Sequence, residues 1–148
     1  MTTVLPQIPK VPQSLLLIGA KKKDGLDFCK QLLGPTHIAK IDSGNHPDLH
    51  HYIPEGKSGL HPMANMQRLI RETALPPFEA KRKIFLIEEA EKMLPSSSNA
   101  LLKTLEEPPE GAYFLLLSDH PDLLLPTILS RLYPLSYQIQ EIPPLDVT

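Results

Sequence analysis

The sequence predicts an α/β domain built on a doubly wound, mostly parallel sheet, and three observations support this class. Short apolar runs alternate with longer segments of helical periodicity, which is the β-α-β order of such folds. Two of the runs, Ile84–Ile87 and Tyr113–Leu117, contain no charged residue, as expected for strands that are buried on both faces. Two adjacent acids, Glu88 and Glu89, follow the first of these runs, at the strand end where open parallel sheets bind ligands.

Each element follows from a local pattern. An apolar run that ends at Gly19 predicts the first strand, and Gly34 with Pro35 stops the helix after it. Between Met63 and Ile70, apolar residues recur at a spacing of three to four, which predicts a helix. Residues 46–59, rich in Gly, His and Pro, are expected to form a loop. The expected strands are 14–18, 37–41, 84–87, 113–117 and 133–139, and the expected helices are 24–33, 62–75, 96–107 and 123–129.

The composition is that of one soluble domain. The chain has 148 residues, of which 41% are hydrophobic, and its net charge of −2 provides no general positive field for nucleic acid. No apolar run approaches the ~20 residues that cross a bilayer, and the N-terminus shows no signal-peptide pattern. Cys29 is the single cysteine, which excludes an internal disulfide and a cysteine cluster for zinc. We therefore expect a cytoplasmic protein that does not associate with membranes.

The two acids after the central strand match one known element of nucleotide-binding folds. In P-loop ATPases, the first acid of this Walker B element holds Mg²⁺ and the second polarises the attacking water. Glu88 is unusual in this role, because the acid that holds Mg²⁺ is normally the shorter Asp. A solvated acidic start to the next helix also explains Glu88 and Glu89, since acids are favoured near a helix N-terminus. The segment therefore indicates the fold more strongly than it indicates metal binding.

The turn after the first strand is a poor phosphate loop. A working loop reads G-x-x-x-x-G-K-[ST]. Here Gly19 is in place, but Gly25 comes one residue late and is followed by Leu-Asp, whose carboxylate would repel a phosphate. The triplet Lys21–Lys23 could attract an anion, although three successive lysines are more often a solvated turn. We interpret Gly19, Lys23 and Gly25 as remnants of a degenerate loop, and we expect no ATP hydrolysis by this chain alone.

Residues 115–131 contain a buried strand that ends in Ser118 and a short helix that ends in Ser130-Arg131. With this segment the chain resembles the clamp-loader branch of the AAA+ ATPases, most closely the delta-prime type of bacterial DNA polymerase III and next the gamma/tau type. The pattern N-x-L-L-K-x-L-E-E-P-P at 99–109 and T-I-L-S-R at 127–131 carry the resemblance. It covers about residues 14–140 and implies a RecA-like AAA+ P-loop NTPase core with a degenerate phosphate loop.

The resemblance gives Arg131 a role. In clamp loaders the Ser-Arg element is an arginine finger that acts in trans on the ATP of the neighbouring subunit, and Ser130 would orient Arg131. A guanidinium suits this task because it grips two phosphate oxygens and stays charged. Taken alone, Arg131 is an ordinary surface cation at a helix C-terminus. Ser118 stands at the position of a sensor-like polar residue.

The implied function is that of a non-hydrolysing subunit that helps to load the sliding clamp onto primed DNA during replication. Such a chain binds no cofactor itself, since ATP and Mg²⁺ lie on the neighbouring subunit. The implied partners are the gamma/tau and delta subunits, the sliding clamp and, indirectly, primed DNA. Two alternatives stay open: a gamma/tau-like ATPase with an unusual phosphate loop, and a stand-alone interaction domain derived from this fold.

The domain organisation predicted from the sequence has three parts. Residues 1–13 are expected to form an extended N-terminal tail, residues 14–140 the AAA+ core, and residues 141–148 a C-terminal tail. The helical lid and collar domains of the family have no counterpart in these 148 residues, and neither does its four-cysteine zinc module. Leu132 replaces the Cys that follows Ser-Arg in the family pattern.

The histidines raise the question of a metal site. His46, His50, His51 and His61 lie in one region of the sequence, the first two four residues apart. Zinc requires close ligands that are held by further partners, and the neighbouring glycines and prolines argue against a helix that would present such a pair. We therefore expect no metal site. Cys29 is expected to be a small buried hydrophobic residue.

Overall fold

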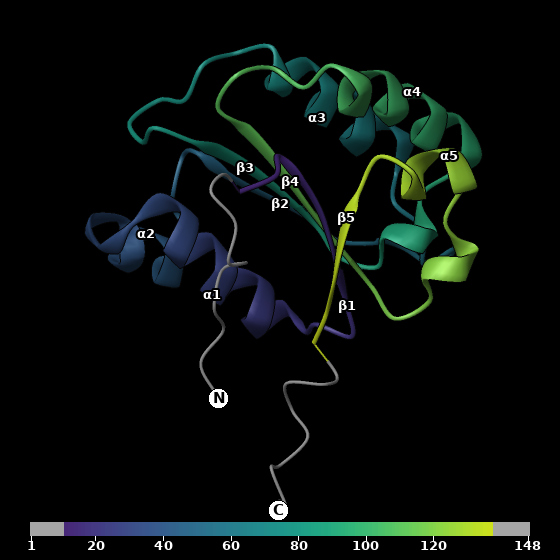
Figure 1. Cartoon of the computed structure of the whole chain (residues 1–148), viewed down its shortest axis with the longest axis horizontal. Helices are drawn as coiled ribbons and strands as arrows, with labels where there is room; N and C mark the ends of the chain where they lie inside the picture. Colours follow the sequence, from purple (N-terminus) through teal and green to yellow (C-terminus); the bar gives the residue numbers. More distant parts are fainter. Residues whose placement is uncertain (1–10, 138–148) are drawn as a thin grey trace, which may run out of the picture.

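The computed structural model describes residues 11–137. They form a five-stranded sheet in the order β2-β3-β4-β1-β5, in which all neighbouring strands are parallel (Figure 1). The strands are β1 (Ser14–Ile18), β2 (Leu49–Tyr52), β3 (Lys83–Ile87), β4 (Ala112–Ser118) and β5 (Tyr133–Ser136). The α-helices are α1 (Lys22–Leu33), α2 (Ile38–Ser43), α3 (Met63–Thr73), α4 (Pro95–Glu106) and α5 (Pro126–Leu129), and 3₁₀ turns lie at Pro35–His37, Ala90–Lys92 and Pro121–Leu123. The predicted α/β class with a doubly wound parallel sheet is confirmed.

Helices cover both faces of the sheet. The helices α1 and α2 lie on one side, and α3, α4 and α5 lie on the other (Figure 1). Successive strand residues therefore alternate between two apolar layers. In β4, Phe114 and Leu116 belong to the layer that contains Met66 of α3, whereas Leu115 belongs to the layer that contains Phe28 of α1. This two-sided burial explains why β1, β3 and β4 appear in the sequence as continuous apolar runs.

The second strand was predicted in the wrong place. Residues 37–41 were expected to be a strand, but they form the end of a 3₁₀ turn and most of α2, which ends at Gly44 with a positive φ of 77°. The strand is instead Leu49–Tyr52, within the expected loop 46–59. Within residues 11–137 this strand lies at the edge of the sheet and pairs only with β3, so polar residues such as His50 are tolerated there. An edge strand carries a weaker hydrophobic pattern than a central one.

The C-terminal third needs a smaller correction. The helix expected over 123–129 is divided into the 3₁₀ turn Pro121–Leu123 and the short helix α5, with the buried Leu124 between them. The last strand begins at Tyr133 as expected, while residues 138 and 139 of its predicted range lie outside the described part. Residues 1–10 and all of the C-terminal segment 141–148 lie outside it as well. Within residues 11–137, no helix has the length and apolar character to span a membrane.

Candidate functional site

The carboxyl ends of β1, β3 and β4 meet at one edge of the sheet, around a crevice of about 280 Å³. This is the edge at which open α/β sheets bind ligands. The crevice is lined by three groups of residues: those that follow β1 (Ala20, Lys21 and Lys22), those that follow β3 (Glu88, Glu89, Glu91 and Lys92), and those at the end of β4 (Leu117, Ser118, Asp119 and His120). The structure thus brings the two acids and Ser118 to one crevice.

The turn after β1 has no room for a phosphate loop. Only residues 19–21 separate β1 from α1, and the N–H of Gly19 donates to the carbonyl of Ser118 at 3.2 Å. Gly25 lies inside α1, where a Cβ atom would stand 3.1 Å from Leu86 Cδ1 and 3.2 Å from Leu117 Cδ2. Gly25 therefore permits close packing of helix on sheet, and Lys23 is an exposed helical residue. Of the three suggested remnants of the phosphate loop, only Gly19 lies in the turn.

The N-terminus of α1 already has an anionic group beside it. Asp24 accepts a hydrogen bond from the N–H of Lys21 through Oδ2, at 2.9 Å. In a phosphate-binding fold, this helix end offers its N–H groups and its positive dipole end to the ligand. Here the chain supplies its own carboxylate, which lowers the attraction for an incoming phosphate.

The Walker B-like acids are also engaged by other side chains. Glu88 Oε2 is paired with the ring Nε2 of His51 of β2. Glu89 adopts a left-handed backbone with φ 46°, and its Oε1 lies 3.4 Å from Nζ of Lys92. Glu89 therefore has a partner other than that of Glu88. The carboxylate in the position of the Mg²⁺ ligand thus has a cationic or hydrogen-bonding partner from this chain, which no sequence motif had suggested.

Ser118 is part of a local network. Its hydroxyl donates to Glu91 Oε1 at 2.6 Å and accepts the N–H of His120 at 3.0 Å, and the residue is almost fully buried. His61 fixes the end of β3 from the other side, because its Nε2 donates to the carbonyl of Glu88 at 2.7 Å. Burial lowers the pKa of His61, which keeps the ring neutral. Sequence reasoning had considered His61 only as a metal ligand.

Arg131 lies just after α5 with its guanidinium half-exposed. Its Nη2 is 3.6 Å from Oε2 of Glu106, the last residue of α4. The hydroxyl of Ser130 donates to the carbonyl of Thr127 at 2.8 Å. Glu106, which the sequence analysis named only as part of the pattern at 99–109, therefore forms an ion pair with Arg131. Leu132, in place of the expected cysteine, is buried in the core.

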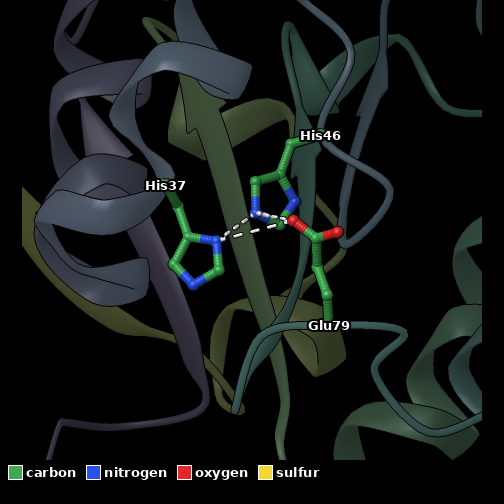
Figure 2. Close-up of side chains that lie close together, drawn as sticks. All are labelled: His37, His46 and Glu79. Atoms are coloured by element: carbon green, nitrogen blue, oxygen red, sulfur yellow. Dashed lines mark hydrogen bonds and ion pairs between the residues drawn. The ribbon is translucent and has the colours of Figure 1, made fainter.

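The four histidines considered as a metal group do not converge. His50 stacks on Phe85 with ring centroids 5.2 Å apart, while His51 and His61 contact the end of β3. His46 instead meets two residues outside that group, His37 and Glu79 (Figure 2). The ring nitrogens of His37 and His46 are 2.7 Å apart, and each is 3.8 Å from Glu79 Oε2.

The hydrogen bonds of this cluster favour a neutral histidine pair over a metal site. His46 Nδ1 accepts the N–H of Asp48 at 3.0 Å, so in a neutral ring its proton is on Nε2, which donates to His37. A metal on Nε2 would require the proton on Nδ1, facing another N–H group. Burial, followed by His37, lowers the pKa of His46. In addition, Lys40 Nζ lies 2.8 Å from both carboxylate oxygens of Glu79, where it already balances the charge.

A larger cavity of about 780 Å³ lies at the opposite ends of the strands, between residues 31–37, at the end of α1 and in the turn after it, and residues that precede β1, β3 and β4. Polar side chains that line it form hydrogen bonds within the chain. Arg82 donates through Nη1 to the carbonyl of Leu32 at 2.7 Å and lies over the ring of Tyr113 at 5.3 Å. Gln13 donates to the carbonyls of Pro109 and Ala112. This cavity is far from the strand ends that carry the motifs.

Sequence comparison identifies the family. The sequence model of the family described as DNA polymerase III, delta subunit, matches residues 10–141. The chain belongs to this family. It is 39% identical over 99 residues to the DNA polymerase III subunit delta' of Bacillus subtilis, covering 67% of this chain and 30% of that protein. It is 40% identical over 113 residues to the subunit delta' of Yersinia pestis, covering 72% and 33%. This DNA polymerase III delta-family chain thus spans about a third of the length of these relatives.

Solved structures support the fold. A gamma subunit-related protein of DNA polymerase III from Thermotoga maritima aligns with a TM-score of 0.64 at 24% identity, covering 84% of this chain and 40% of that protein. A RuvB mutant from the same organism aligns with a TM-score of 0.50 at 18% identity, covering 85% and 38%. At such identities the likeness concerns the fold alone, and it agrees with the fold predicted from the sequence.

Proposed function

We propose that this chain is the AAA+ core of a delta-prime-like clamp-loader subunit that does not hydrolyse ATP itself and supplies Arg131 to the ATP of a neighbouring subunit. Its family and the delta' relatives support the assignment to the DNA polymerase III clamp loader. The neighbours in the ring would be gamma/tau and delta subunits. The complex would load the sliding clamp onto primed DNA, with ATP and Mg²⁺ on the gamma/tau side.

The observation that carries the proposal is that the residues at the carboxyl ends of β1 and β3, where a nucleotide would bind, already pair with other residues of this chain. The turn before α1 has three residues, Asp24 lies at the helix N-terminus, and Glu88 is paired with His51. Each of these features removes one requirement of phosphate or Mg²⁺ binding. A chain of this fold that lacks its own ATP site can still act on the ATP of a partner.

The position of Arg131 is compatible with that action. The side chain is 49% exposed, so it can reach another subunit. Its backbone is fixed on both sides, because Ile128 and Leu132 are buried in the core. A charged fork on a rigid base can place two donors on a γ-phosphate as negative charge develops there in the transition state.

A gamma/tau-like ATPase is the second candidate. A gamma/tau subunit of Mycobacterium bovis is 36% identical to this chain over 78 residues, which is 52% of this chain. That function would require tight binding of Mg·ATP by the chain alone. The short turn before α1, Asp24 at the helix N-terminus and the pair of Glu88 with His51 argue against it. Equilibrium binding of Mg·ATP distinguishes the two candidates.

The central experiment is Arg131→Ala in a loader reconstituted with the full-length subunit. Truncation of an exposed side chain should change the free energy of unfolding by no more than about 0.5 kcal/mol, so assembly should persist. ATP turnover stimulated by clamp and primed DNA should fall several-fold without vanishing, because other sites in the ring keep their own arginines. Arg131→Lys should rescue poorly, since an ammonium lacks the two-pronged geometry. An Arg131→Ala loader that assembles and turns over ATP at the wild-type rate would falsify the proposal.

A further inference from the structure

We infer that Glu106 is a positioning residue for Arg131: it holds the guanidinium in the direction in which a neighbour's phosphate can take up its donors. The inference rests on the proposed function and adds to it a role for Glu106, which the family pattern at 99–109 contains without a role. It begins from a contact between the ends of two helices. Glu106 is the last residue of α4, and its Oε2 lies 3.6 Å from Nη2 of Arg131, two residues after α5.

The contact orients Arg131 without consuming its hydrogen-bond donors. At 3.6 Å, the N···O distance is that of an ion pair and exceeds the ~2.7–3.2 Å of a hydrogen bond. Among the side chains of residues 11–137, Glu106 is the ion-pair partner of Arg131, and the guanidinium donates no hydrogen bond there. Its five N–H groups stay available for phosphate oxygens. An exposed arginine loses much rotamer freedom when it is ordered, and a nearby carboxylate reduces this loss before the phosphate arrives.

Glu106 is also poorly explained by local structure. Two acids, Glu106 and Glu107, stand at the C-terminal end of α4, where the negative end of the helix dipole disfavours carboxylates. Arg131 supplies the compensating charge to Glu106. Local rules that a sequence breaks are often broken at functional sites. The backbone that carries Arg131 is rigid on both sides, so the side-chain direction is the remaining degree of freedom, and Glu106 acts on it.

Glu107 provides a matched control. It is adjacent, acidic and exposed, and within the described part of the chain it has no ion-pair partner. Glu106→Gln and Glu107→Gln make the same chemical change at the same helix end. Both remove an unfavourable charge from the helix dipole, so neither should lower the melting temperature of the subunit. A difference between them in the loader therefore reports on Arg131.

The test uses the reconstituted loader with the full-length subunit and measures ATP turnover stimulated by clamp and primed DNA. We expect Glu106→Gln to lower kcat about two- to five-fold, equivalent to ~0.4–1 kcal/mol, with the KM for ATP unchanged because the neighbour binds ATP. Glu107→Gln should behave as wild type. Glu106→Asp, which keeps the charge, should recover part of the loss. The ratio of wild type to Glu106→Gln should shrink as salt screens the half-exposed pair.

A double-mutant cycle separates this inference from the proposed function. If Glu106 acts through Arg131, Glu106→Gln should have no further effect in the Arg131→Ala background. If Arg131→Ala slows turnover while Glu106→Gln equals Glu107→Gln, the positioning role is refuted and the proposed function stands. If Glu106→Gln slows turnover equally with and without Arg131, Glu106 acts by another route and the inference is again refuted. If Arg131→Ala has no effect, the proposed function and the inference both fail.

Discussion

Substitution of Gly25 tests whether this residue belongs to a phosphate loop or to a helix–sheet contact. A phosphate-loop glycine could be replaced at the expense of nucleotide binding, with little effect on folding. The structure puts Gly25 on the sheet-facing side of α1, against Leu86 and Leu117, whose side chains are 0% and 3% exposed. We therefore expect the substitutions to change the free energy of unfolding.

For Gly25→Ala two effects oppose each other. Alanine in a helix interior is favoured over glycine by about 1 kcal/mol. Against this, the new Cβ would stand 3.1 and 3.2 Å from two leucine methyl groups in a full core, and overpacking of this kind costs about 1–3 kcal/mol. The net loss should be about 0–2 kcal/mol. Gly25→Val adds two further carbon atoms and gains less helix propensity, so its loss should exceed about 2 kcal/mol.

The assay is thermal and urea unfolding of the 148-residue chain, followed by circular dichroism. For a domain of this size, 1 kcal/mol shifts the melting temperature by roughly 3 °C, so Gly25→Val should melt at least about 6 °C below wild type. Lys23→Ala, an exposed change two residues earlier in α1, is the control and should stay within about 0.5 kcal/mol of wild type. A Gly25→Val variant as stable as Lys23→Ala would refute the packing role and leave Gly25 available for a loop.

Three further outcomes are expected. Asp48→Asn should lower the free energy of unfolding by about 2–4 kcal/mol near pH 7, because the buried carboxylate accepts the N–H groups of three successive residues, 78–80. Burial alone would raise the pKa of Asp48, but these three hydrogen bonds lower it below its unfolded value of about 3.9. The carboxylate therefore stabilises the fold fully above that value, and the difference in unfolding free energy between wild type and variant should narrow as pH falls below about 4. Calorimetry of the chain with Mg·ATP should give no dissociation constant near or below ~10 μM, about −7 kcal/mol, and such binding would favour the gamma/tau-like alternative. Elemental analysis after dialysis should give well under one zinc per chain, and one zinc that is lost in His46→Ala would overturn the neutral histidine pair.

The elements that the sequence predicted well are those whose burial is symmetric. β3 and β4 lie between two helical layers, so every residue of their runs is apolar or buried, and the pattern is visible without any knowledge of neighbours. β2 was missed because its residues have a single neighbouring strand and include two histidines. The burial of His50 against Phe85 depends on a residue 35 positions away along the chain, which a local pattern cannot register.

The candidate site shows the same division. The sequence placed Glu88 and Ser118 each at the carboxyl end of a buried strand, and in the structure both line the same crevice. Their partners did not follow, since His51 and Glu91 reach them from other segments. Likewise, the patterns at 99–109 and 127–131 contained Glu106 and Arg131 but gave no indication that the two side chains meet. A motif gives the residue types along one segment, whereas the chemistry of each side chain depends on contacts between segments.

The loss of the phosphate loop has a structural cause that substitution alone cannot reverse. In this chain three residues separate β1 from α1, which begins at Lys22 and whose Gly25 lies close to the sheet. Placing Lys-Ser at positions 26 and 27 would restore the sequence motif inside α1. At those positions the backbone N–H groups already donate to carbonyls of the preceding helical turn. A cradle for phosphates needs free N–H groups in a longer turn, so residues would have to be inserted before Lys22. After this short turn, Gly25 of α1 lies close to Leu86 of β3 and Leu117 of β4. The short helix α5, which precedes Arg131, lies on the other face of the sheet from α1 (Figure 1).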